Sequence, residues 1–178
     1  LERRDHVADH VFRRVVQQHA KPAGTIEARA LARDDLDQQR VLSLAVIADG
    51  TPYAGLLPFV TLPGYAGVMI HASRMAKHSA GLMAGARVGV LLHEQDGAEK
   101  DPLQLQRATF ESEVHPLERK GEAWLAGRER WLQRFPDSRI TFNLGDFTLY
   151  RLEFSQGLYV GGFGRAVDIE PRDIAKLA

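Results

Sequence analysis

The chain has 178 residues, of which 44% are hydrophobic and 26% are charged, proportions typical of one globular domain with a sizeable core. Its 23 Lys and Arg balance its 23 Asp and Glu, so no overall basic field favours nucleic acid or an anionic membrane as a partner. It contains no cysteine, which excludes disulfides, iron–sulfur clusters, thiolate metal sites and a cysteine nucleophile. No window is apolar enough for a membrane span and no leader pattern opens the chain, so we expect a cytoplasmic protein.

The N-terminal region is predicted to be helical. Apolar residues recur at helical spacing over residues 5–19, which predicts an amphipathic helix. Lys-Pro-Ala-Gly at 21–24 ends that pattern, and a second helix is predicted over 25–39. We therefore expect residues 1–24 to form a helical arm outside a single domain that covers residues 25–178.

A β-hairpin follows. Residues 41–48 and 53–60 are rich in strand-forming apolar residues and are joined through Asp49-Gly50, a pair that favours the tight turn of a two-residue hairpin. A third strand is predicted over 67–72, after a turn around Pro63 and Gly64.

The rest of the chain alternates strands with short helices. A short helix is predicted over 74–84, a strand over 87–93 and a cleanly alternating strand over 107–115. Apolar residues at helical spacing predict a helix over 117–135 that packs on the sheet. The remaining predicted elements are strands over 146–154 and 158–163, a turn at 155–157 between them, and a helix over 168–177.

About seven strands with few and short helices between them favour antiparallel pairing, because parallel strands need long crossover connections. A doubly wound parallel sheet is therefore disfavoured. The predicted fold class is mainly β with flanking helices, as a six- to seven-stranded antiparallel split β-barrel.

The segment from strand to helix at residues 73–78 carries the strongest chemical signal. Ser73 stands in the capping position of the predicted helix, followed by Arg74, Lys77 and His78. A helix N-terminus attracts anions through its unpaired amides and its dipole, and three basic side chains add to this, so a phosphate is the predicted ligand. The alternative is that Ser73 only caps the helix while the cations face solvent; the spacing leaves both interpretations open.

Other motifs give weaker indications. Gly161–Gly164 lacks the spacing of a dinucleotide-binding loop. His6 and His10 are four residues apart without an evident third ligand, so no metal site is predicted. The serines lack a nucleophile-elbow pattern, and no catalytic side chain is assigned.

Four segments, 49–59, 73–78, 145–152 and 160–166, together resemble the pyridoxamine phosphate oxidase-like split-barrel proteins, with the haem-utilisation branch as the nearest group. The similarity runs in the same order over about residues 25–170. The Ser-Arg-x-Ala-x-His motif combined with the Gly-Gly-Phe-Gly-Arg-Ala motif is more specific than either part alone.

This resemblance implies a homodimer with two sites for flavin mononucleotide (FMN) at the subunit interface. It places the flavin phosphate at residues 73–78, the ring along strand residues 56–58 and the ribityl chain beside residues 70–71. The flavin contacts that it implies are Leu56, Leu57, Pro58, Ile70, His71, Ser73, Arg74, Lys77, His78 and Arg107.

The expected function is that of an FMN-binding oxidoreductase in which the flavin performs the redox chemistry. One alternative is a haem-binding or haem-degrading protein on the same fold, and another is a flavin-binding protein without turnover. Only Arg165 offers a cation near the last motif, which disfavours pyridoxamine phosphate oxidation itself. The haem-utilisation branch uses a histidine of a C-terminal extension as iron ligand, and no histidine follows His115 here, so a ligand of that kind is not expected.

Overall fold

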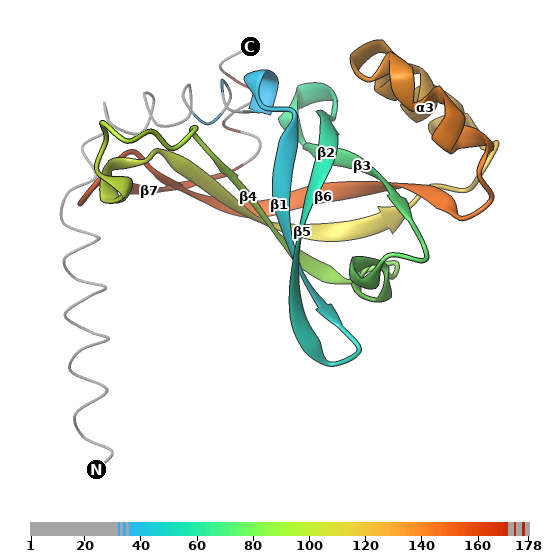
Figure 1. The fold of residues 1–178 in the computed structure, drawn as a ribbon, viewed down its shortest axis with the longest axis horizontal. Helices are drawn as coiled ribbons and strands as arrows, with labels where there is room; N and C mark the ends of the chain where they lie inside the picture. The colour runs from blue at the N-terminus through green and yellow to red at the C-terminus, as the bar shows by residue number, and fades with distance from the viewer. Residues whose placement is uncertain (1–31, 33, 35, 171–172, 174–175, 177–178) are drawn as a thin grey trace.

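A computed structural model describes residues 32, 34, 36–170, 173 and 176 of the chain (Figure 1). The predicted arm over 1–24 lies outside the described residues, and so does most of the predicted helix over 25–39. The described end of that helix is helical to Gln38, and its Ala32 and Leu36 are fully buried against the barrel core. The division of the chain into an arm and a domain stays a prediction.

Seven antiparallel strands form one sheet in the order β3-β2-β1-β4-β5-β6-β7, and an additional pairing of β3 with β6 closes six of them into a barrel. This confirms the predicted antiparallel split barrel, with β7 as an extra strand on the outside of β6. The strands are β1 (Val41–Ala48), β2 (Thr51–Thr61), β3 (Gly67–Ser73), β4 (Arg87–His93), β5 (Arg107–Pro116), β6 (Phe147–Val160) and β7 (Ala166–Ile169).

Helical segments are short and flank the barrel. Helix α3 (Glu122–Arg134) lies against one side of it (Figure 1). It is shorter than the predicted helix over 117–135, because Gly121 stands at its N-cap. The 3₁₀ helices are η1 (Pro63–Tyr65), η2 (Lys77–Gly81), η3 (Pro102–Gln104) and η4 (Pro136–Asn143).

The predicted turn at 155–157 is wrong. Strand β6 runs through it without a break, pairing with β5 on one side and β7 on the other. Gly157 serves packing there: a Cβ on it would lie 2.7 Å from the Phe110 ring. The predicted helix over 168–177 also needs correction, because Ile169 still belongs to β7.

The strands alternate between a buried and an outward side, and the buried sides define two cores. The larger core fills the barrel, with Leu44, Phe59, Ile70, Val90 and Phe110 all fully buried. The second core lies between the sheet and helix α3. Its buried members are Val60, Leu62, Met69, Trp124, Trp131, Phe142 and Leu149.

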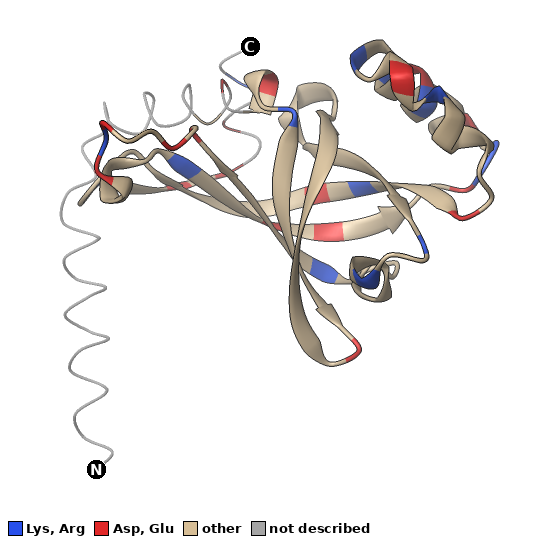
Figure 2. Cartoon of the chain, in the orientation of Figure 1, with Lys and Arg blue, Asp and Glu red and all other residues tan. Residues whose placement is uncertain are grey.

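The outer side of β2, β1 and β4 is unusually apolar for a solvent-facing surface. Val41, Ile47 and Leu56 are 43%, 58% and 70% exposed. Figure 2 shows that the β1–β2 hairpin carries no charged side chain except Asp49 at its turn. We call this surface the outer face.

Candidate functional site

The predicted phosphate-binding segment is a turn tied to the loop before β6. The Ser73 hydroxyl donates to Asp146 Oδ2 at 2.5 Å and accepts the Met75 backbone N–H at 3.1 Å. The Arg74 guanidinium donates to the Gly145 carbonyl at 2.8 Å. Both side chains thus have protein partners, and one of those partners is a carboxylate.

The predicted helix over 74–84 is wrong in length and in capping. The structure has a 3₁₀ helix of five residues, η2, whose N-cap is Ala76 and which has no side-chain cap. Ser73 is the last residue of β3 rather than a helix cap. A helix this short has little dipole, so the expectation of an anion site at a helix N-terminus loses its basis.

Lys77 and His78 place polar groups beside the β1–β2 hairpin. Lys77 Nζ lies 5.3 Å from the centroid of the Tyr53 ring. The His78 ring lies over Gly55, where a Cβ would be 3.6 Å from Nδ1. Burial lowers the His78 pKa, and its Nε2 is buried without a hydrogen-bond partner among the described residues. A buried, unpaired nitrogen favours a polar ligand at this point.

His71 has very different surroundings. It is 7% exposed, stacked on Phe142 with ring centroids 4.0 Å apart and edge-on to Trp131 at 5.6 Å. Thr141 donates its hydroxyl to the Ser138 carbonyl and so accepts from His71 Nδ1 at 3.2 Å. Burial, assisted by the charge of Arg119, lowers the pKa of His71 to about 4. The ring is a neutral member of the core under α3.

The other predicted flavin contacts lie on two sides of the sheet. Leu57 and Ile70 point into the barrel and are 5% and 0% exposed. Leu56 and Pro58 lie on the outer face. Arg107 opens β5 opposite His93 of β4, and its guanidinium donates to the Leu105 carbonyl at 3.2 Å. The structure therefore joins residues 73–78 in one turn beside β2, and it does not bring the other predicted contacts together on one side of the sheet.

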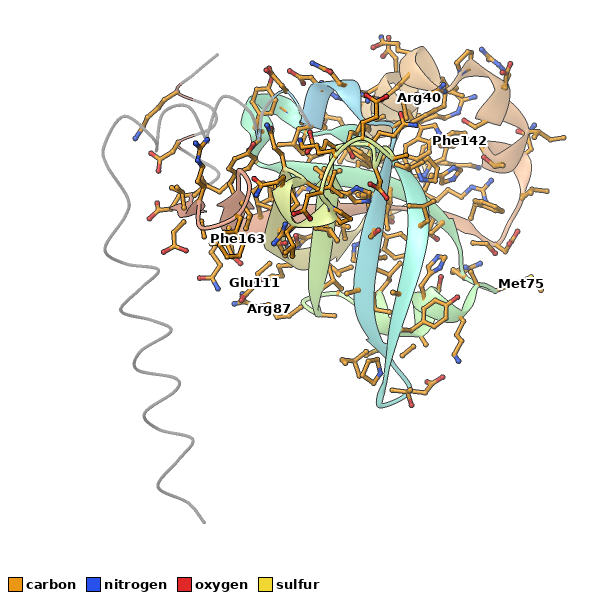
Figure 3. All side chains as sticks on the ribbon, turned by 60° about the vertical axis from the view of Figure 1, so that its left-hand side comes forward. Arg40, Met75, Arg87, Glu111, Phe142 and Phe163 are labelled. Carbon is orange, nitrogen blue, oxygen red and sulfur yellow. The ribbon has the colours of Figure 1, made fainter. Side chains whose placement is uncertain are left out.

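Two grooves hollow the outer face. The first, the hairpin groove, has a volume of about 500 Å³ and lies between the β1–β2 hairpin and β4. Its walls are largely apolar, and Arg87 and Glu111 lie side by side at its edge, with Nη1 and Oε2 3.9 Å apart (Figure 3).

The second groove, the rim groove, has a volume of about 240 Å³ and lies at the other end of β1. Val41, Leu56 and Leu91 give it apolar walls, while Arg40 and His93 add a cation and an imidazole. The sequence analysis assigned neither of these polar residues to a site, since a histidine at the end of a strand is usually only exposed. His93 could have been found from the alternation of β4, which places it on the same side as Leu91.

Two other features are absent from the described residues. No group of three His, Cys, Asp or Glu side chains is placed to hold a metal ion there. Within the same residues, no helix is long and apolar enough to cross a membrane.

The closed antiparallel barrel with flanking helices defines the class of this protein as a split barrel. A curated relative, the haem oxygenase HutZ of Vibrio cholerae, is 30% identical over 139 residues, which are 77% of this chain and 78% of the relative. The chain belongs to the pyridoxamine phosphate oxidase-like split-barrel family, in its haem-utilisation branch. No family model matches the sequence.

Solved structures agree with this assignment. A haem-binding protein from Mycobacterium smegmatis superposes with a TM-score of 0.70 at 25% identity over 88% of this chain, which spans 62% of that protein. A crystal structure of V. cholerae HutZ, described as a haem storage protein, gives a TM-score of 0.64 at 25% identity and covers 71% of this chain and 89% of its own.

Proposed function

We propose that this chain binds haem on its outer face and acts in haem utilisation. Haem is a flat apolar macrocycle with two carboxylates at one edge, so it needs an apolar surface flanked by cations. The observation that carries the proposal is the rim groove, where the side chains of Val41, Leu56 and Leu91 lie beside the cation of Arg40.

The position of the cations supports this proposal. Arg40 lies at the start of β1, with its guanidinium carbon 5.1 Å from the centroid of the Phe135 ring, a contact that holds the charge near the groove. Arg107 stands opposite His93, one strand further along the sheet. Both cations suit the propionates of haem.

Titration of the purified protein with haemin tests the proposal. We expect a saturable shift of the haem Soret band with one haem per chain, and weaker binding by Arg40→Ala than by the control Arg139→Ala, an exposed arginine of η4. Because the curated relative is named a haem oxygenase, we extend the proposal to oxidation of the bound macrocycle, with loss of the Soret band after addition of a reductant in air. The absence of saturable haemin binding would contradict the proposal.

A second candidate ligand is FMN, favoured by the unpaired Nε2 of His78 next to Lys77. The flavin phosphate would be held by Arg74, Lys77 and His78, and the ring would lie along β2. The fit is partial, because the Ser73 hydroxyl already donates to the Asp146 carboxylate, which would repel a phosphate. When bound, the flavin would supply the redox chemistry.

A titration followed by flavin fluorescence measures FMN binding and so tests this second candidate. Replacing both Arg74 and Lys77 by Ala is expected to raise the dissociation constant of FMN about a hundredfold, since each charge-assisted contact contributes about 1.5–3 kcal/mol. Riboflavin, which lacks the phosphate, should bind more weakly than FMN to the unchanged protein. Equal affinity for the two flavins would rule out this phosphate site.

We also propose that the protein is a homodimer, joined through the outer face. Exposed apolar surface of this kind is rare on monomers, and a second copy would cover Ile47 and the hairpin groove around it. Sedimentation should give twice the chain mass of 19.8 kDa, and Ile47→Asp should shift the protein to the monomer. A monomer at micromolar concentration without the substitution would contradict the proposal.

A further inference from the structure

We propose that Phe163 of each copy inserts into the hairpin groove of the other copy in the homodimer. This inference rests on the proposed homodimer and deepens it, since it names the side chain that one copy contributes to the groove of the other. It is carried by the loop that presents Phe163, residues 161–165 between β6 and β7, which we call the glycine loop. The apolar groove and the charges beside loop and groove supply the rest of the argument.

The glycine loop has one defined shape, closed by its own backbone. The Gly161 N–H donates to the Arg165 carbonyl at 2.9 Å, and the Arg165 N–H donates to the Gly162 carbonyl at 3.1 Å. Gly162 and Gly164 have φ of 122° and 75°, values that residues with a side chain rarely adopt. The glycines therefore allow a turn that places Phe163 between them.

A neighbouring segment holds the glycine loop in place. The Phe163 N–H donates to the Gln104 side-chain oxygen at 3.4 Å, and a Cβ on Gly162 would lie 2.9 Å from the same oxygen. Gln104 belongs to η3, whose N-cap Asp101 accepts the Leu103 N–H at 2.9 Å. With its backbone held in this way, Phe163 is still 74% exposed. A large aromatic side chain presented by a fixed backbone is typical of interface anchors, because little conformational freedom is lost on binding.

The glycine loop lies at the margin of the outer face. Leu91 of the outer face is opposite Thr109 of β5, and Thr109 is opposite Leu158 of β6, which is 39% exposed. This row continues the surface to the strand that leads into the loop. Figure 3 shows Phe163 at the same side of the molecule as Glu111, which lies at the edge of the hairpin groove. Loop and groove thus belong to one continuous surface.

The hairpin groove has room for an aromatic ring. It opens where β1 and β4 diverge: their pairing ends at Ala45 opposite Gly89, although β1 continues to Ala48. Ala45, Ala54 and Gly89 are among the lining residues, and their small size leaves the floor of the groove low. A cavity of about 150 Å³ is enough to hold benzene, so a groove of about 500 Å³ accommodates the ring of Phe163.

Symmetry and charge favour a second copy as the occupant. When two copies face each other across a two-fold axis perpendicular to the line from loop to groove, each loop lies over the groove of the other copy, as an isologous interface requires. The exposed Arg165 belongs to the loop, and Glu111 at the groove edge lies 3.9 Å from Arg87, which is too long for a hydrogen bond. Glu111 is therefore placed to accept from Arg165 of the second copy.

Cross-linking tests the inference, because the chain contains no cysteine of its own. Two single variants, Ile47→Cys in the groove and Phe163→Cys in the loop, are mixed, left to exchange subunits and treated with a short bismaleimide. We expect a covalent dimer of twice 19.8 kDa, which neither variant should give alone. The matched control pairs Ile47→Cys with Ile140→Cys, a position of η4 that is 68% exposed, and should give no covalent dimer.

Sedimentation measures the contribution of the ring. Phe163→Ala should raise the dissociation constant of the dimer at least about thirtyfold, the loss expected of an interface hot spot. Ile140→Ala should leave this constant unchanged. Because Phe163 is exposed in the single chain, its replacement should leave the circular dichroism of the protein unchanged.

The outcomes separate the inference from the proposed homodimer. A monomeric unchanged protein would overturn both. A dimer that Phe163→Ala leaves intact, with equal cross-linking in the test and control mixtures, would overturn the inference alone and leave the groove to another occupant, such as a small apolar ligand. A weakened Phe163→Ala dimer together with selective cross-linking would support the inference.

Discussion

The core under helix α3 and the outer face both lie on the outside of the barrel but surround an imidazole in opposite ways. In the core, His71 is stacked on Phe142, and its Nδ1 is hydrogen-bonded to Thr141. On the outer face, His93 uses one nitrogen for the Glu94 carbonyl and lines a groove. Both histidines point away from the barrel interior, so what separates a structural from an available histidine here is whether α3 and η4 cover that part of the barrel.

The largest expected effect comes from emptying the core under α3. Trp131 is 2% exposed and its indole N–H donates to the Ser138 hydroxyl at 2.8 Å. Trp131→Ala should lower the free energy of unfolding by about 3–5 kcal/mol, because it leaves a cavity and removes the indole donor from the Ser138 hydroxyl. Urea unfolding measures this, with Leu125→Ala, an exposed position on the same helix, as the control. Equal midpoints for the two variants would mean that this core adds nothing to stability.

Protonation of His71 should lower the stability of the fold at acidic pH. Its pKa falls from the ordinary value of 6.5 to about 4 in the folded chain, so the folded state favours the neutral ring. The stabilisation is present above pH 6.5 and is lost as the pH falls from 6.5 towards 4, by about 3 kcal/mol in total. His71→Phe should remove most of this dependence in urea titrations from pH 7 to 4. The control His115→Gln should retain it, and an identical pH profile for both variants would refute the assignment.

The smallest effect on stability is expected on the outer face. Leu56 is 70% exposed whereas its neighbour Leu57 is 5% exposed. Leu56→Ala should change the free energy of unfolding by less than about 0.5 kcal/mol. It should raise the dissociation constant of haemin about tenfold, because the lost contact with the macrocycle is worth roughly 1.4 kcal/mol. Leu57→Ala is the matched control, and it should lower the free energy of unfolding far more than Leu56→Ala does.

The barrel itself could be predicted from the sequence, because alternation and turn chemistry act locally. Asp49-Gly50 set the hairpin, and both residues adopt positive φ in the structure. The continuity of β6 through residues 155–157 could not be predicted. A glycine that makes room for the Phe110 ring looks the same in sequence as a glycine that makes a turn.

The candidate site was less predictable than the fold. The basic residues of 73–78 do share one turn, but the carboxylate that receives the Ser73 hydroxyl comes from Asp146, far along the chain. His71 was expected beside a flavin, and its place in the aromatic core depends on residues of η4 and α3 that no local pattern connects to it.

The pairing of β3 with β6 has a consequence for how this protein meets other molecules. An open sheet presents unpaired backbone groups at its edges, which can recruit further strands and lead to aggregation. Here β3 and β6 bond to each other over the whole of β3, and the described strand that extends the sheet beyond the barrel, β7, has only four residues. The edge of β3 that this pairing occupies is therefore closed to strand addition, so contacts made there with other molecules involve side chains rather than backbone.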